Sequence, residues 1–319
     1  MVDVIVKPAG FWIVMSTLAA LTALSPAGIV AKREGNQVVV RKDERVVLVY
    51  QAEPGPLPRK DLPELFRRGG YIASLRTLAG VEVTDDFPPD HPHHHGVWNP
   101  WTKTRFQGRT PDFWNMGEGT GRVEFVELKA IHNRGTSAGF EARHRFVDLS
   151  ADEPVTALWE TWSIDVSAPD NRVVVDFTST QTCATESPLI LPEHRYGGFG
   201  FRGNRAWNGE DGCGFLAATG ETDRLKIENT RQDWCWMGGD VGGRTAGVYI
   251  LCHPENFRAP QPVRAHPEQP FFCYSPPKAG EMSIRPDEPY VARYRLIIAD
   301  GAPDAEAAET WWKEYRGDE

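Results

Sequence analysis

Alternating apolar and polar positions dominate the middle of the chain and predict a succession of β-strands. In Val155–Val166 and Arg172–Ala184, apolar side chains occupy one face, and Thr, Glu, Ser, Asp and Gln occupy the other. This two-residue period is typical of a half-buried strand. Arg122–Ile131 and Gly139–Leu149 are also rich in β-forming residues, and turn signals separate the four segments. Such a succession favours antiparallel strands in a sandwich or barrel.

Similar segments on both sides extend the predicted sheets. They are Asn36–Val40, Val46–Gln51, Gly70–Leu78, Val81–Val83, Leu189–Arg202, Gly212–Ala218, Arg244–His253 and Tyr290–Ala299. One helix is predicted over about residues 304–315, where Pro303 precedes the run AEAAETWWKEY. Because no fixed repeat or internal linker interrupts residues 32–319, we predict one large, all-β antiparallel sandwich with a short C-terminal helix.

The first residues have the pattern of an apolar leader. Residues 11–24 carry no charge, but this stretch is shorter than the roughly 20 residues that span a bilayer. Ala27 and Ala31 suit a signal peptidase, so we expect residues 1–31 to be a signal peptide or apolar leader. The mature chain would then be periplasmic or secreted, with no membrane span. The alternatives are a lipid-facing anchor, or a true start at Met15 that would leave the chain in the cytoplasm.

Composition narrows the classes of partner. The 319 residues include 35 Lys and Arg against 44 Asp and Glu, a formal net charge of −9. An acidic chain lacks the basic face that phosphate contacts need, which excludes nucleic acid as a partner. Eleven Trp, 30 Gly and 25 Pro favour a β-rich protein with aromatic-lined surfaces. None of the five Cys lies in a CxxC pair, so we interpret them as mainly buried structural thiols.

The most conspicuous motif is the histidine-rich segment HPHHHG at residues 91–96. In extended backbone, His91, His93 and His95 would share one face and His94 would take the other. Neutral imidazoles at this spacing are suited to bind zinc, iron or copper, or to act as a general acid–base pair. The alternative is a structural loop fixed by its proline and glycine.

Several other polar residues are candidates for chemistry. Glu160 shares a strand face with Trp162, so it is either a proton donor with a raised pKa or a member of a solvated cross-strand ion pair. Glu193 and His194 precede a glycine-rich bend, where they would complete a metal shell, act as acid–base partners, or belong to a structural bulge. His253 lies at the end of an apolar strand, where it is either a further metal ligand or a histidine held by hydrogen bonds.

Aromatic residues follow the histidine segment closely. They are Trp98, Trp101, Phe113 and Trp114. Either they form an aromatic wall that stacks on the apolar face of a sugar, or they pack in the hydrophobic core. As substrate-positioning residues we select Trp98, Trp114, Arg202 and Asp112.

Six segments in chain order resemble the PmoA-like domain family, labelled "methane oxygenase PmoA", over roughly residues 34–302. They are HPHHHGVW, DFWN, ETW, VVVDFTST, YGGFGFRG and RYRLIIADG. The resemblance implies a β-sandwich similar to the galactose-mutarotase type. Its label would suggest a metal-dependent oxygenase, although the copper methane monooxygenase subunit crosses the membrane several times and this chain has at most one apolar leader.

The favoured hypothesis is a carbohydrate-active enzyme that uses acid–base chemistry, with or without the assistance of a metal, on a sugar or glycoside. The predicted catalytic residues are His93, His94, Glu193, Glu160 and His194. If a divalent metal is the cofactor, its tentative ligands are His91, His93 and His253. The alternatives are a noncatalytic carbohydrate-binding or structural sandwich, and a metal-dependent oxygenase. The expected partner is a small-molecule or oligosaccharide substrate.

Overall fold

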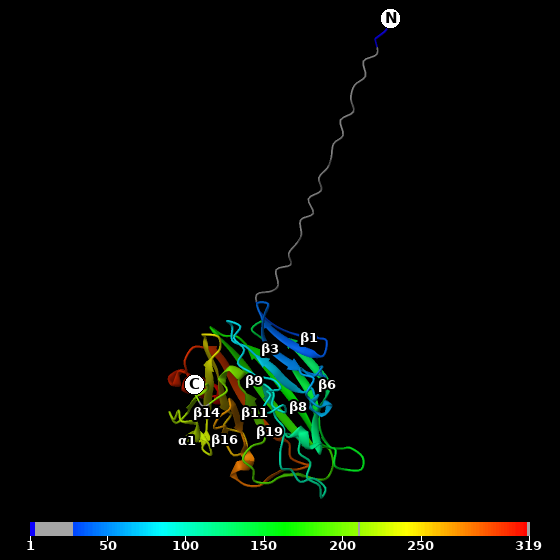
Figure 1. The fold of residues 1–319 in the computed structure, drawn as a ribbon, viewed down its shortest axis with the longest axis vertical. Helices are drawn as coiled ribbons and strands as arrows, with labels where there is room; N and C mark the ends of the chain where they lie inside the picture. The colour runs from blue at the N-terminus through cyan, green and yellow to red at the C-terminus, as the bar shows by residue number, and fades with distance from the viewer. Residues whose placement is uncertain (4–27, 210, 318–319) are drawn as a thin grey trace.

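The computed structural model describes residues 1–3, 28–209 and 211–317. Within these ranges the strands form a nine-stranded sheet (sheet I), an eight-stranded sheet (sheet II) and a separate two-stranded pair. Sheets I and II are antiparallel and enclose a common hydrophobic core (Figure 1). The predicted fold, a large all-β antiparallel sandwich with a short C-terminal helix, is confirmed.

Sheet I is built from short strands that come from distant parts of the chain. In spatial order they are β1 (Ile29–Glu34), β2 (Gln37–Lys42), β3 (Arg45–Gln51), β4 (Tyr71–Leu75), β5 (Val97–Trp98), β11 (Phe199–Arg202), β17 (Phe271–Tyr274), β16 (Gln261–Ala265) and β13 (Arg231–Gln232). At its centre, Gly200 of β11 lies opposite Trp98 of β5 on one side and Cys273 of β17 on the other.

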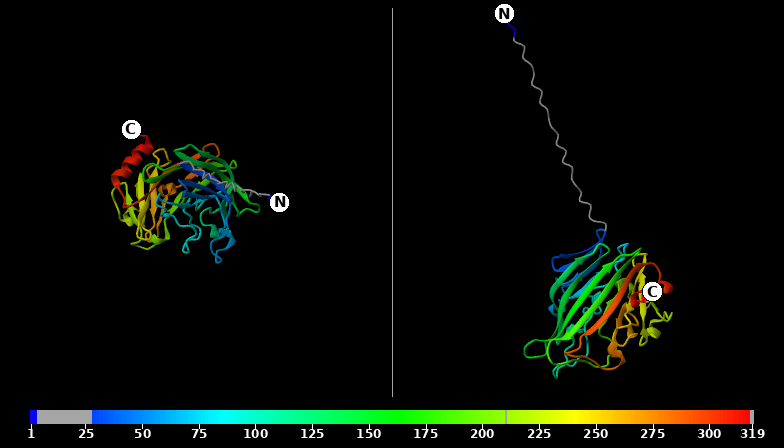
Figure 2. Two further views of the ribbon diagram at one scale, coloured as in Figure 1. Left: turned by 90° about the horizontal axis from the view of Figure 1, so that it is seen from above. Right: turned by 180° about the vertical axis from the view of Figure 1, so that it is seen from behind.

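Sheet II contains the long, regular strands. In spatial order they are β12 (Gly214–Ala217), β14 (Trp234–Asp240), β15 (Thr245–Cys252), β19 (Tyr290–Asp300), β9 (Arg172–Cys183), β8 (Val155–Ser167), β7 (Ser137–Asp148) and β6 (Gly121–Asn133). The separate pair is β10 (Leu189–Leu191) with β18 (Met282–Ile284), and a short helix, α1, spans Arg224–Ile227. Figure 2 (right) shows sheet II from behind, with its strands side by side.

The predicted alternation holds along β8. Glu160 and Trp162 are both 1% exposed and face sheet I, whereas Trp159 and Thr161 are half-buried on the outer face. The guanidinium of Arg143, from the neighbouring strand β7, lies 4.2 Å from the Trp159 ring centroid. Cation–π contact of this kind covers an aromatic ring that would otherwise face water.

The C-terminal helix α2 (Ala305–Arg316) has conventional end signals and one apolar face. The Asp304 side chain accepts hydrogen bonds from the first turn, and Gly317 ends the helix in the left-handed conformation. Trp312 packs on Trp234 and other residues on the outer face of sheet II, and it donates to the carbonyl of Cys252 at 3.1 Å. The helix lies outside the sandwich, on sheet II (Figure 2, left).

The boundaries differ from the prediction in two places. Strand β1 begins at Ile29, and Ala31 is buried in the core with 3% exposure. The fold therefore starts within the range that we expected to be the leader. Residues 4–27 of that leader lie outside the described part of the chain. The predicted strand over residues 189–202 divides into β10 and β11, because Gly197 and Gly198 turn the chain at positive φ. None of the described helices is long and apolar enough to cross a membrane.

A buried polar network links the two sheets. The Tyr50 hydroxyl of β3 lies 2.6 Å from Nε2 of His144 on β7, and Nδ1 of His144 lies 3.2 Å from Oε2 of Glu160. The other carboxylate oxygen of Glu160 accepts hydrogen bonds at 2.6–2.9 Å from Asn99, Ser179 and Gln181. Because Tyr50 and Asn99 belong to the side of sheet I, these hydrogen bonds hold the sheets in one relative position.

The environment of Glu160 gives it a structural role. Burial alone would raise the pKa of its carboxyl, but hydrogen bonds from His144, Ser179 and Gln181 outweigh burial and hold the pKa below its usual value. The expectation of a proton donor with a raised pKa is therefore wrong for this residue. The alternative of a solvated ion pair is also wrong, because the side chain is inside the sandwich.

Replacing Glu160 by Ala should lower the free energy of unfolding by about 3–5 kcal/mol, because His144 and three other polar groups lose a buried partner. Urea unfolding followed by tryptophan fluorescence measures this change. The control is Glu124→Ala, which removes a partly exposed carboxylate paired with Arg145 at 2.6 Å and should cost under about 1 kcal/mol. Equal losses in the two variants would contradict a linking role for the network.

The same network predicts a pH dependence. Because the folded-state pKa of Glu160 is lowered, its stabilisation is fully present above the ordinary glutamate value of about 4.3 and is lost as the pH falls through the folded value. The difference in unfolding free energy between the wild type and Glu160→Gln should therefore shrink below about pH 4. A difference that grows in acid would refute this assignment.

Candidate functional site

The histidine segment forms a tight loop between β4 and β5 on the face of sheet I that points away from sheet II. The backbone N–H of Phe87 donates to the carbonyl of His94 at 3.1 Å and closes the loop. Phe87 has a φ of 50°, which is strained for a bulky residue. At the other end, a Cβ on Gly96 would lie 2.7 Å from the carbonyl oxygen of Ile72, so only glycine lets the loop lie this close to β4.

The imidazoles of the loop stack on one another instead of alternating between two faces of a strand. The N–H of His94 donates to the carbonyl of His91 at 2.9 Å, so the backbone turns here. The rings of His91 and His94 are stacked with centroids 4.7 Å apart, and His94 also stacks on Phe271 at 4.9 Å. His93 meets His94 edge-on at 4.7 Å. The expected grouping of His91, His93 and His95 is therefore wrong, because the segment is a turn and not a strand.

These imidazoles line a cavity of about 150 Å³, which we call the histidine cavity. Its walls consist of four imidazoles (His91, His93, His94, His266), three aromatic rings (Trp114, Tyr196, Phe271) and the polar side chains of Asn115, Arg195 and Arg264. The combination of flat aromatic faces with hydrogen-bonding groups is suited to a small ligand that has both apolar and polar surface.

Burial keeps three of the cavity imidazoles, those of His93, His94 and His266, neutral at neutral pH. It lowers the pKa of His93 and of His266 to about 4, with smaller effects from neighbouring cationic groups. The pKa of His94 is lowered further for the same reason, and its Nδ1 is buried without a hydrogen-bond partner. A neutral imidazole has one donor and one acceptor nitrogen. These rings can therefore both donate hydrogen bonds to a ligand and accept them from it near neutral pH.

An ion pair beneath the loop orients His91. The fully buried guanidinium of Arg202 contacts the Asp90 carboxylate at 3.2 Å, and Oδ2 of Asp90 lies 3.0 Å from Nδ1 of His91. Arg202 also bonds to Asn208 at 2.9 Å and Gln269 at 3.2 Å. Burial would raise the pKa of Asp90, but Arg202 and His91 outweigh it and lower the pKa. Arg202, expected to position substrate, does not line the cavity and instead positions Asp90 and His91.

Asp112 has a comparable supporting role on the opposite wall. Its Oδ1 accepts hydrogen bonds from the backbone N–H groups of Trp114 and Asn115 at 2.9 and 2.8 Å, and its Oδ2 accepts from Thr102 at 2.7 Å. Trp98 is fully buried with its ring centroid 4.8 Å from that of Trp114. Of the four residues selected for substrate positioning, Trp114 is the one that lines the cavity, and Trp98 and Asp112 support it.

The remaining predicted site residues lie elsewhere. Glu193 is exposed, and with His194 it lines a neighbouring cavity of about 410 Å³. His253 packs edge-on against Tyr315 of α2 at 5.0 Å. No three His, Cys, Asp or Glu side chains in the described ranges are arranged to hold a metal ion. The tentative ligand set of His91, His93 and His253 is therefore not formed.

Sequence reasoning missed part of the cavity wall. Phe271 and Arg264 come from β17 and β16, and His266 comes from the loop between them. The apolar run QPFFCYS at residues 269–275 indicates a strand, but it does not indicate that Phe271 reaches the site. The one residue here with candidate chemistry was His266, in a proline-rich stretch of the sequence.

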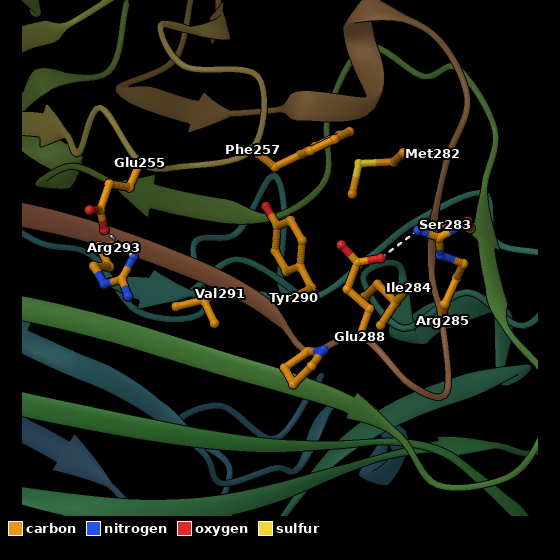
Figure 3. A pocket seen from close by; sticks show the side chains of 11 residues that line it. Glu255, Phe257, Met282, Ser283, Ile284, Arg285, Glu288, Tyr290, Val291 and Arg293 are labelled. Carbon is orange, nitrogen blue, oxygen red and sulfur yellow. Dashed lines mark hydrogen bonds and ion pairs between the residues drawn. The ribbon is translucent and has the colours of Figure 1, made fainter.

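A larger cavity of about 490 Å³ lies near β18 and the start of β19 (Figure 3). Its charged side chains are already paired, Glu255 with Arg293 at 3.2 Å and Arg285 with Glu288 at 2.5 Å. The histidine cavity is the stronger candidate site because the imidazoles of His93, His94 and His266 are neutral and Nδ1 of His94 has no hydrogen-bond partner in the described ranges.

The fold and this cavity define an antiparallel β-sandwich protein with a small, histidine-lined cavity on the outer face of one sheet. The chain belongs to the family described as "Family of unknown function (DUF6807)", whose model matches residues 37–313. The resemblance to a PmoA-like family is wrong, because the matching family has no oxygenase label. The oxygenase hypothesis rested on that label and falls with it.

No curated protein matches the chain. Among solved structures, the GH36 α-galactosidase AgaB from Geobacillus stearothermophilus matches with 10% identity and a TM-score of 0.34, over 85% of this chain and 39% of that one. A galactose mutarotase-like protein from Clostridium acetobutylicum matches with 12% identity and a TM-score of 0.35, over 85% and 95%. The chain thus spans about two fifths of the α-galactosidase. At such TM-scores the likeness does not extend to an activity.

The neutral state of the cavity can be measured directly. In NMR titrations, the imidazole signals of His93 and His266 should shift with midpoints near pH 4, because burial disfavours the cation. His93→Gln and His266→Gln assign the signals. Since both folded-state pKa values are lowered, acid favours the unfolded chain, and stability should fall as the pH drops from about 6.5 toward 4. Midpoints near 6.5 would show that the cavity is open to water.

Proposed function

We propose that the chain is an enzyme that transfers protons on a sugar or glycoside bound in the histidine cavity. The observation that supports this proposal is the group of imidazoles on one wall of a small cavity, among which His94 is buried and has a ring nitrogen without a hydrogen-bond partner in the described ranges. Side chains that serve only as packing have no need of buried, unpaired ring nitrogens, because apolar residues fill space without the desolvation penalty. General acid–base catalysis does need such groups.

The proposed roles follow from the contacts. Asp90, held by Arg202, accepts from Nδ1 of His91 and so favours one tautomer of that ring. His93 has no such carboxylate partner among its hydrogen bonds in the described ranges. One ring would therefore start as the imidazolium and give its extra proton to a sugar oxygen, while the other starts neutral and takes a proton from a second oxygen, so that the charge of the pair does not change overall.

The rest of the wall favours a sugar as the ligand. Trp114 and Phe271 offer aromatic faces to the C–H side of a pyranose ring, and Asn115, Arg195 and Arg264 offer donors to its hydroxyl groups. The volume of about 150 Å³ is below the roughly 300–1,000 Å³ of cavities for drug-sized ligands. We therefore propose a single sugar ring as the group that enters the cavity.

His93→Ala should lower turnover by about 10²–10⁴-fold, because a proton-transfer group is lost. Turnover is measured by the NMR signals of anomeric protons for a panel of free aldoses, and by release of nitrophenol from nitrophenyl glycosides. The control is His132→Ala, on β6 and away from the cavity, which should keep full activity.

The outcome also separates an enzyme from a binding module. If the wild type binds sugars without turning them over, and His93→Ala binds them with the same affinity, then the protein is a noncatalytic sugar-binding module and not an enzyme. Turnover that survives both His93→Ala and His91→Ala would refute the proposed site.

A further inference from the structure

The histidine loop has a second cavity on its other side, distinct from the histidine cavity. This cavity, which we call the Arg68 pocket, has a volume of about 280 Å³. Its walls come from the turn between β1 and β2, the loop after β3, and the start of the histidine loop. The residues used below are Asn36, Gln37, Gly55, Arg68, Tyr71 and Asp86.

Arg68 is a buried cation without a counter-ion. It is 4% exposed, yet no ion pair is formed by this side chain among the described residues. Its Nε donates to the carbonyl of Gly69 at 3.2 Å, its Nη1 lies 3.9 Å from the Met116 sulfur, and its Nη2 has no hydrogen-bond partner in the described part of the chain. A buried guanidinium with an unused edge is expected to bind an anion, above all a carboxylate.

The nearest carboxylates do not satisfy Arg68. Glu160 and Asp86 act on it through space only, and Glu160 is already engaged in the network between the sheets. Asp86 is held by other groups: its Oδ1 lies 2.6 Å from Nδ1 of His95, and its Oδ2 accepts from the Tyr71 hydroxyl at 3.2 Å. Burial raises the pKa of Asp86 to about 7. At neutral pH the Asp86 carboxyl is therefore about half protonated, which reduces the negative charge that an incoming anion would meet.

The remaining walls are polar and uncharged. The half-buried Asn36 amide makes no side-chain hydrogen bond in the described ranges, and Gln37 donates to Gln51 at 2.7 Å, which leaves its carbonyl oxygen available. Amides next to a carboxyl group are the side chains that bind sugar hydroxyl groups through paired donor and acceptor contacts. The site thus combines one point for a carboxylate with several points for hydroxyl groups.

From this arrangement we infer that the Arg68 pocket binds a small sugar acid, with the carboxylate on Arg68 and the hydroxyl groups on Asn36, Gln37 and Asp86. This inference does not depend on catalysis in the histidine cavity. The two cavities share the loop as a wall, but their lining residues differ.

Calorimetric titration of the full chain with D-glucuronate tests the inference, with D-glucose and acetate as matched probes. Glucuronate should bind at least about 10-fold more tightly than either probe, because glucose lacks the charge and acetate lacks the hydroxyl groups. Arg68→Met should weaken glucuronate binding by at least about 10-fold. The control is Arg67→Met, at an exposed neighbouring position, which should bind like the wild type.

A second variant keeps the test decisive if Arg68→Met does not fold. Gly55 lines the pocket, its φ is not positive, and a Cβ there would meet Asn36 and Gln51 at 3.4 Å, an ordinary contact. Gly55→Phe should therefore fold and block the pocket, whereas His132→Ala, on β6 and outside both cavities, should leave glucuronate binding unchanged. Absence of glucuronate binding to folded wild type, glucuronate binding that Arg68→Met leaves intact, or full glucuronate binding by Gly55→Phe would each overturn the inference.

Discussion

The buried carboxylate of Glu160 is the constraint on which the arrangement of the two sheets depends. A charge at this position is destabilising unless every oxygen finds a donor. The donors come from both sides of the sandwich: His144, Ser179 and Gln181 lie on sheet II, and Asn99 follows β5 of sheet I. Apolar packing alone tolerates sliding of one sheet over the other, whereas this hydrogen-bonding pattern is satisfied in one register only. The same hydrogen bonds that lower the pKa of Glu160 therefore fix where the end of β5 lies, and β5 carries the histidine loop.

The site depends on a second feature of sheet I, the different use of its two faces. Val97, Phe201 and Phe272 point into the core between the sheets, whereas their strand neighbours Trp98, Phe271 and Cys273 belong to an aromatic cluster on the outer face. Outer faces of antiparallel sheets are commonly polar. Here the loops at residues 88–96 and 112–116 cover the cluster, and the histidine cavity remains between them. The rigid floor comes from strands, and the chemically active groups come from loops, which is the usual division in binding sites.

The parts of the fold that sequence predicts are those with a clear two-residue period, such as β8 with Glu160 and Trp162 on the inner face. Strand β14 has no such period, because α2 covers its outer face and the core covers its inner face; Trp234 and Trp236 are as buried as Cys235 and Met237. The histidine motif identifies one wall of the site from sequence alone. The other walls depend on the order of strands in sheet I, where β5, β11 and β17 become neighbours although they are far apart in the chain. No local pattern encodes that order, so Phe271 and His266 are identified only in three dimensions.

The adjacent residues His94 and His95 serve different sides of the histidine loop. His94 faces the histidine cavity and stacks on Phe271, whereas His95 turns to the opposite side, stacks on Tyr71 with ring centroids 3.9 Å apart, and contacts Asp86. Burial lowers the pKa of both rings, so two adjacent histidines are kept neutral in two separate environments. Such a segment tolerates little movement, since a shift that improves one ring's contacts would disturb those of the other. The positive φ of Phe87 and the close approach of Gly96 to β4 are strained or restricted conformations that persist because contacts on both sides of the loop determine its position. One short loop thus sets the geometry of two cavities, and a ligand that moves the loop in one of them would change the shape of the other.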